Sequence, residues 1–152
     1  MQSLSIHLRC VLTALTLPLL VGSAQAQWCV AQHANGQLVP VRERPGPSMF
    51  WAHSSWDMDG WPAITYGPPF FRLPPIMQEF TKFHECAHLA EQTTDEFQAN
   101  CSALRAMRSR GLSQQQENFI ANFHRNIGPI GPQYGGSGVA FWQGTLQACG
   151  EN

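Results

Sequence analysis

The residues of this chain best suited to chemistry lie between Phe83 and Cys101, where the sequence reads FHECAHLAEQTTDEFQANC. On a helix each residue advances by about 100°, so His84 and His88 lie on one face, one turn apart. Two imidazoles at that separation can bind one tetrahedral Zn²⁺ ion. Glu85 is displaced around the helix, where it can take a proton from a zinc-bound water that the metal has made more acidic. The spacing predicts a zinc site with Glu85 as its general base.

A third protein ligand is needed if the fourth position on the metal is to hold water. Glu96 is the expected third ligand, and Asp95 is the reserve. Thr93-x-x-Glu96 also fits a capping box, in which Glu96 would turn back to the backbone. We expect Thr93 or Thr94 to cap the helix, Glu96 to face the metal, and Asp95 to serve as a first-turn charge. The competing interpretation is that the two histidines are ordinary hydrogen-bonded core residues.

The HExxH stretch lies in a segment whose apolar residues recur with the period of a helix. These apolar residues are Ile76, Phe80, Phe83, Ala87 and Ala90. Their spacing predicts an amphipathic helix with one buried stripe. The helix is expected to begin at Pro74-Pro75, because proline is tolerated in the first turn, and to end near Glu91 or Gln92.

Two further helices are expected after the HExxH helix. The second spans residues 93–111 and ends on a glycine, which suits a helix C-terminus. The third opens with a capping box formed by Ser113 and Gln116 and stops at Gly128. The glycine-rich tail, residues 131–152, is expected to be loop with a short final element.

The part of the chain before the helices is predicted to hold short strands. Asn35-Gly36 separates two strand-like runs, which is a hairpin signal, and Pro40 confines the second run to a sheet edge. Residues 63–66 form another strand candidate. The sequence as a whole predicts a small α+β domain, with a hairpin and an edge strand packed on two or three helices.

Residues 42–62 are expected to be loop, since turn-forming residues occur throughout this segment. Within it, Asp57-x-Asp59-Gly60 superficially fits the start of a calcium loop. Nothing else of that pattern follows, so the segment is interpreted as a plain turn.

The sequence HECAH at residues 84–88, followed by EFQAN at residues 96–100, resembles the gluzincin group of zinc metallopeptidases. In that group an HExxH helix is followed by a second helix with an E-x-x-A-[DN] pattern. The resemblance implies the two histidines and Glu96 as zinc ligands, Glu85 as general base, and an upstream edge strand that aligns a peptide, a role for which residues 63–66 are placed. It covers residues 64–111 and is specific only at the two helices.

The chain also departs from that pattern. Asn100 stands where many such proteins have an aspartate, and an asparagine oxygen accepts a histidine N–H without adding charge. No transition-state stabiliser is identifiable by motif. His124 and Tyr134 are the candidates, and the alternative for each is an ordinary helix-surface or loop residue. His33 and His53 lie in turn-rich segments and are interpreted as solvated.

The N-terminal segment has the order of a secretory signal peptide. Arg9 precedes the apolar run of residues 11–21, and the small-x-small sequence of residues 24–26 follows. Cleavage is predicted before Gln27, which leaves residues 27–152 as one domain. We therefore expect a secreted or periplasmic protein with no membrane segment in its mature form.

Cysteine usage fits export. Cys10 belongs to the signal segment, and Cys29, Cys86, Cys101 and Cys149 remain. Four cysteines in an exported chain most often form two disulfides, with three connectivities open. Joining the two ends through Cys29–Cys149 is favoured, and Cys86–Cys101 would then pin the two metal-bearing helices. Two buried free thiols are the alternative.

Charge gives little support for a nucleic-acid partner. The formal net charge is −1, charged residues make up 12% of the chain, and there is no run of like charges.

Three functions stay open at this level. The leading hypothesis is an exported zinc metallopeptidase acting on a peptide or protein. The others are an inactive, zinc-stabilised binding module on a protease-like scaffold and a disulfide-held structural protein without metal. Nothing in the sequence indicates an oligomeric state.

Overall fold

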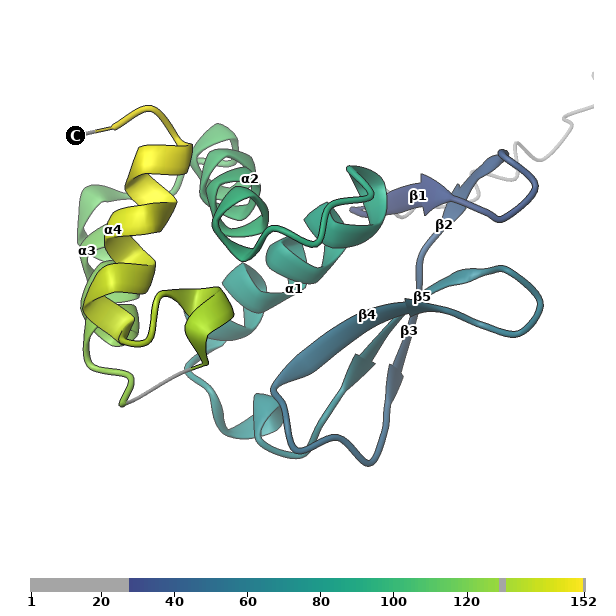
Figure 1. Cartoon of the computed structure of the whole chain (residues 1–152), viewed down its shortest axis with the longest axis horizontal. Coiled ribbons are helices and arrows are strands. Elements are labelled where there is room, and N and C mark those ends of the chain that lie inside the picture. Colours follow the sequence, from purple (N-terminus) through teal and green to yellow (C-terminus); the bar gives the residue numbers. More distant parts are fainter. Residues whose placement is uncertain (1–27, 129–130, 152) are drawn as a thin grey trace, which may run out of the picture.

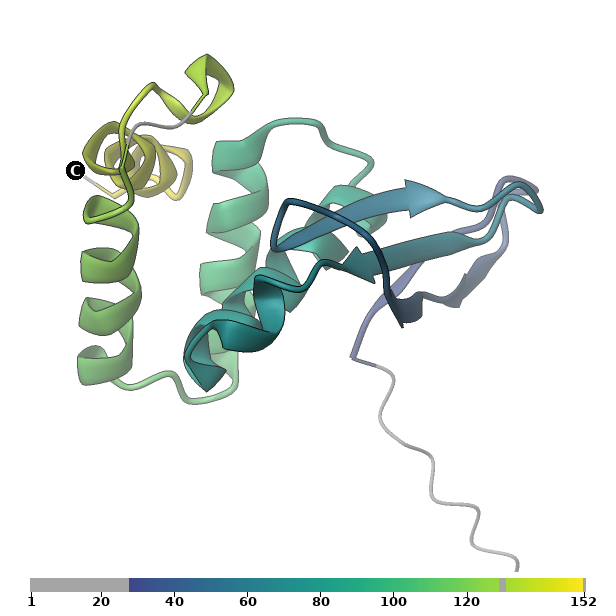
Figure 2. The same cartoon turned by 90° about the horizontal axis from the view of Figure 1, so that it is seen from below.

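The computed structural model describes residues 28–128 and 131–151. The predicted signal peptide and its cleavage site before Gln27 lie outside these residues. The described chain is α+β, as predicted, with helices gathered on one side and strands on the other in both views (Figures 1 and 2). None of its helices is long and apolar enough to cross a membrane.

The first two strands form the predicted hairpin. β1 (Val30–Gln32) pairs antiparallel with β2 (Leu38–Pro40). Gly36 in the connecting turn has φ +86°, a conformation that glycine adopts without strain. Pro40 ends a strand that has one paired neighbour, which confirms its expected place at an edge.

The remaining strands form a second sheet in the order β3-β5-β4. β3 (Arg42–Pro45) pairs parallel to β5 (Pro62–Tyr66), and β4 (Ala52–Trp56) pairs antiparallel to it. The prediction that residues 42–62 are loop was therefore wrong for two strands. Every residue of β5 is buried, because β5 lies in the middle of the sheet, and the edge strand beside the helices is β4.

The turn between β4 and β5 is a plain turn, as predicted. The N–H of Gly60 donates to the carbonyl of Asp57 at 2.8 Å, and Gly60 has φ +78°. The two aspartates pair with arginines of β3: Arg44 lies 2.6 Å from Asp57, and Arg42 lies 2.9 Å from Asp59. These guanidinium groups hold the pKa of both carboxyls below its usual range.

The three predicted helices are present. They are α1 (Pro75–Ala90), α2 (Glu96–Ser109) and α3 (Gln114–Arg125). Ser113 and Gln116 form the expected capping box at the start of α3. Gly111 follows the C-terminus of α2 with φ +91°, as expected for the left-handed residue that ends many helices.

The glycine-rich tail is more ordered than predicted. A short 3₁₀ turn, η2 (Pro132–Tyr134), precedes an eleven-residue helix, α4 (Gly138–Ala148), whose Trp142 is almost fully buried. A Cβ atom on Gly138 would lie 1.9 Å from the carbonyl oxygen of His124, and one on Gly144 would lie 2.5 Å from the ring of Phe97. The glycines thus let α4 pack closely against α3 and α2, and they do not mark loop.

The four cysteines form two disulfides, but the favoured pairing was wrong. Cys29 bonds Cys86 with a Cα–Cα distance of 5.8 Å, and Cys101 bonds Cys149 at 5.3 Å. The physical reason is the direction of Cys86, which leaves α1 on the flank that meets β1. Because α2 packs on a different flank of α1, Cys101 faces α4 instead. One disulfide ties the hairpin to α1, and the other ties α4 to α2.

Candidate metal centre

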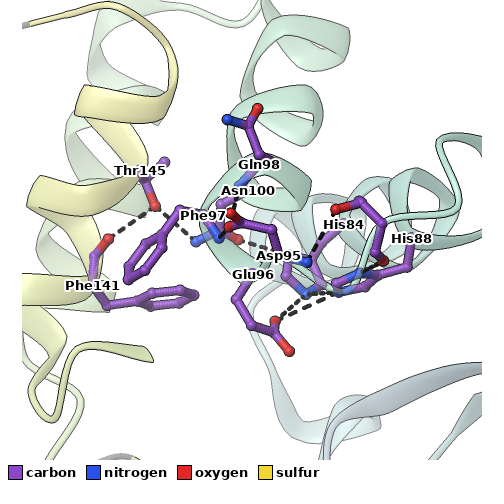
Figure 3. A network of polar contacts seen from close by, with 10 residues as sticks. His84, His88, Asp95, Glu96, Phe97, Gln98, Asn100, Phe141 and Thr145 are labelled. Carbon is purple, nitrogen blue, oxygen red and sulfur yellow. Dashed lines mark hydrogen bonds and ion pairs between the residues drawn. The ribbon is translucent and has the colours of Figure 1, made fainter. Parts of the chain in front are cut away.

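Two helices and the tight turn between them bring the expected ligands together. His84 and His88 lie on consecutive turns of α1, and Glu96 is the first residue of α2 (Figure 3). Asp95 caps α2, because its carboxylate accepts hydrogen bonds from the N–H groups of Phe97 and Gln98 at 2.9 and 3.1 Å. The expectation that a threonine caps this helix was wrong. Since Asp95 takes that role, Glu96 is free to turn toward the histidines.

The three side chains present one face of a small tetrahedron. The Nε2 atoms of His84 and His88 are 3.0 Å apart, and the Glu96 Oε2 atom lies 3.1 Å from the first and 3.5 Å from the second. For ligand bonds near 2.05 Å, the edge of a tetrahedral zinc site is about 3.3 Å. The three atoms therefore have the separations that one metal ion requires, and these residues could hold one.

The outer nitrogen of each histidine is already committed as a donor. His88 Nδ1 donates to the carbonyl oxygen of Thr93 at 2.8 Å, since that oxygen can only accept. His84 Nδ1 lies 2.8 Å from Asn100 Oδ1. With the proton on Nδ1, a neutral imidazole carries a bare lone pair on Nε2. Both lone pairs point into the space that Glu96 also faces.

A buried chain of hydrogen bonds from α4 sets the orientation of Asn100. The Thr145 hydroxyl donates to the carbonyl of Phe141 at 3.0 Å, so it can accept from Asn100 Nδ2, also at 3.0 Å (Figure 3). The amide oxygen of Asn100 is therefore the atom that faces His84. Asn100 is 1% exposed and Thr145 is fully buried. The chain thus fixes which nitrogen of His84 carries the proton.

The electrostatics of the cluster favour a cation. The Glu96 Oε2 atom is buried, and it lies 3.1 and 3.5 Å from the two imidazole nitrogens. Burial acts to raise the pKa of Glu96, but the two imidazoles lower it to about 2. Burial acts to lower the pKa of His88, yet Glu96 and the Thr93 carbonyl raise it overall. A carboxylate that stays ionised beside two imidazoles favours positive charge in the site, either a proton on a ring or a metal ion.

The cluster lies in a cleft of about 1030 Å³ between the helices and the edge strand β4. Its lining includes the expected base, Glu85, which is 7% exposed. The charge of Glu85 is a minor contribution to the raised pKa of His88, after Glu96 and the Thr93 carbonyl. The sequence did not predict the contribution of β4 to the cleft, because those residues carry turn signals.

His124 and Tyr134 also line the cleft. His124 is 3% exposed, so the alternative that it is an ordinary helix-surface residue is wrong. Its Nδ1 donates to the carbonyl of Ile120 at 2.9 Å, its ring stacks on Trp142, and burial lowers its pKa to about 4. Tyr134 is half-buried in η2, and burial followed by the charge of Glu96 raises its pKa.

The other histidines lie away from the ligands. His53 is exposed on β4, and His33 packs edge-on against Trp61 in the hairpin turn, with both at the wall of the cleft. Neither belongs to the group that could hold a metal among the described residues.

Comparisons of the chain with protein-family models, curated proteins and solved structures give no match. The class of site is therefore defined by its own geometry: two histidines and one glutamate from adjacent helices, at metal-binding distances, in a cleft beside an edge strand.

Proposed function

We propose that this protein is an exported zinc-dependent hydrolase, most simply a metallopeptidase. The observation that carries the proposal is the convergence of two imidazole Nε2 atoms and one buried carboxylate oxygen within 3.5 Å of one another. Three such atoms stay this close only with positive charge between them, either a proton on an imidazole or a metal ion. Two histidines and one glutamate are a known ligand set of catalytic zinc.

Glu85 supplies the second requirement, a base beside the ligands that does not belong to them. Bound Zn²⁺ would polarise a substrate carbonyl and lower the pKa of water. Glu85 then accepts the proton of the attacking water and returns it to the leaving amine. In this proposal Tyr134, which lines the same cleft, donates to the oxygen on which negative charge develops.

The edge strand favours a peptide over other carbonyl substrates. β4 has a neighbour on one side only, and residues 51–54 of this segment line the cleft opposite the ligands. An extended peptide can pair with the free backbone of such a strand. The resemblance to gluzincins suggested residues 63–66 for this role, but β5 is a central strand, and β4 takes its place in the proposal.

The metal itself needs measurement, because two histidines and one carboxylate also bind Fe(II) in some enzymes. Zinc is favoured here because Glu85 adds a base suited to hydrolysis. Elemental analysis of the purified protein, and of protein reconstituted with each metal separately, distinguishes the two. Stoichiometric iron with no affinity for zinc would contradict the zinc assignment.

The test of the hydrolase is the matched pair of wild type and Glu85→Gln. Both are expected to bind one Zn²⁺, since Glu85 is not a ligand, while the variant loses at least a hundredfold in hydrolysis of a peptide library. Equal activity in the two proteins would remove Glu85 as the base. Bound zinc without turnover in either protein would favour the binding-module alternative, which the uncharged partner of His84, Asn100, also motivates.

Export is part of the same proposal. The two disulfides are typical of proteins that fold in an oxidising compartment, as is the predicted signal peptide. Fractionation of cells that express the full chain, with N-terminal sequencing of the product, tests both export and cleavage before Gln27.

A further inference from the structure

The two ends of the cleft differ in their lining. Phe80, His84 and His88 lie on successive turns of α1, each about 6 Å from the next, so the proposed metal site occupies the middle of the cleft. Beyond Phe80, the lining comes from Phe141, Ile127 and the loop before β4. Beyond His88 the lining is mixed: Gln92 bonds Gln32 at 2.7 Å, and Trp56, which donates to the carbonyl of Gln32, lies at the same end. One end is thus apolar, and the other is mixed and holds no lysine, arginine or carboxylate among the described residues.

The apolar end carries two large side chains that are exposed on an anchored loop. Met49 is 93% exposed and Phe50 is 69% exposed. The loop itself is fixed, because the N–H of Gly46 donates to Tyr66 and the N–H of Gly67 donates to Trp51, both at 2.9 Å. Exposed apolar side chains at the rim of a pocket indicate a surface that another molecule covers.

The cleft offers little to a charged substrate. Across the described residues that line it there is neither lysine nor arginine, and its two acidic side chains are Glu85 and Glu96. A phosphate, an acidic side chain or a terminal carboxylate would find no permanent protein cation there. A terminal amine would find both carboxylates already engaged by the proposed chemistry. The charges therefore exclude recognition of a chain end and favour an internal bond.

We infer that the substrate is an uncharged internal segment of a polypeptide, bound extended beside β4 with a bulky apolar side chain at the end formed by Phe50, Phe80 and Phe141. This inference rests on the proposed function and specifies its substrate class. β4 has five residues and a length of about 16 Å, so roughly five substrate residues are engaged. The scissile bond lies next to the apolar side chain, on the side toward Gln92.

The first test uses zinc-loaded protein and a library of internally quenched peptides with both ends blocked. Internal cleavage beside leucine, phenylalanine or methionine is expected, with at least a tenfold loss when that residue is replaced by aspartate, lysine or phosphoserine. Cleavage that requires a free terminus, or that prefers charged residues, overturns the inference.

The second test removes the apolar rim without touching the proposed ligands or base. Met49→Ser combined with Phe50→Ser is expected to raise KM for the preferred peptides about tenfold, with kcat within twofold of wild type and zinc affinity unchanged. Met58→Ser is the matched control, because Met58 is also a fully exposed apolar side chain but does not line the cleft. An equal effect in the control, or no effect in the double variant, overturns the inference.

A further arm separates this inference from the hydrolase proposal. If zinc-loaded wild type cleaves no peptide, the hydrolase proposal is wrong. The inferred preference for an uncharged segment with an apolar side chain is then tested by peptide binding alone. Fluorescence anisotropy of the labelled, end-blocked peptides with zinc-loaded Glu85→Gln then reports the preference directly. Binding of the apolar peptides that weakens in the Met49/Phe50 double variant supports the inference, and absence of binding overturns it.

Discussion

Replacing Thr145 with valine tests how α4, a helix that supplies none of the proposed ligands, contributes to the metal centre. Valine has nearly the same shape as threonine but lacks the hydroxyl that accepts from Asn100 and donates to Phe141. In the variant the Asn100 N–H is left unpaired at a site that is 1% exposed. The amide of Asn100 then has no fixed orientation, and its oxygen no longer faces His84 in every molecule.

The expected magnitudes follow from these contacts. An unsatisfied buried donor costs about 1–3 kcal/mol, so the free energy of unfolding of the metal-free protein should fall by that amount. Loss of an outer-shell partner of a ligand histidine weakens metal affinity by about 10- to 100-fold. Because Thr145 acts through Asn100, we expect the lower value, about tenfold in the zinc Kd.

The assay pairs zinc competition against a chelating fluorophore with urea unfolding in the presence of EDTA. Thr145→Ser is the control, since it keeps the hydroxyl and removes one methyl group, at about 0.8 kcal/mol of stability. The serine variant should therefore lose stability but keep wild-type zinc affinity. Zinc Kd values of the valine and serine variants that agree within twofold would refute the orienting role of the hydroxyl.

The other predictions concern the ligand set, the buried histidine and a disulfide. Zinc at a thousandfold excess over its Kd should raise the free energy of unfolding of the wild type by about 4 kcal/mol. The same zinc concentration should stabilise Glu96→Gln far less, because the variant lacks the charge of the ligand. Equal zinc-induced shifts of Tm for the two proteins in calorimetry would contradict the assignment of Glu96 as a ligand. Burial lowers the pKa of His124 to about 4, so the unfolded chain, with a pKa near 6.5, binds the proton first as pH falls. The contribution of neutral, buried His124 to the free energy of unfolding is thus complete above about pH 6.5 and is lost toward pH 4. Over that range, urea titrations should show the wild type losing about 3 kcal/mol more stability than His124→Phe. Parallel pH dependences of the two proteins would contradict this prediction. Replacing both Cys101 and Cys149 with alanine should lower the free energy of unfolding by about 4 kcal/mol, since their disulfide closes a loop with a sequence separation of 48. Peptide mapping of the wild type without reduction checks the pairing. Any other linkage of these cysteines would contradict the prediction.

The local parts of the fold could be predicted because their signals are local. The period of the apolar residues fixed α1, the Ser113 capping box fixed the start of α3, and Asn35-Gly36 fixed the hairpin. The expected ligand set followed in the same way, since His84 and His88 share a helix face and Glu96 opens the next helix. Each of these features depends on residues within a few positions of one another.

The errors concern features that depend on distant partners. β4 forms because β5 pairs with it, although its own residues carry turn signals. α4 forms because α2 and α3 bury Phe141 and Trp142 and need glycine where the helices approach closely. The cap of α2 was also assigned to the wrong residue, because threonine and aspartate are both good caps and the choice depends on where Glu96 points.

The sequence by itself determined the α+β class, the positions of the first three helices and the residues that could hold a metal, because helical periodicity and capping act over a few residues. Tertiary structure decided the disulfide partners, the strand that borders the cleft, and the chain from Thr145 through Asn100 that orients His84. The reason is physical: a side chain's partner across the fold depends on which faces of two elements pack together, and that packing is a property of the whole chain.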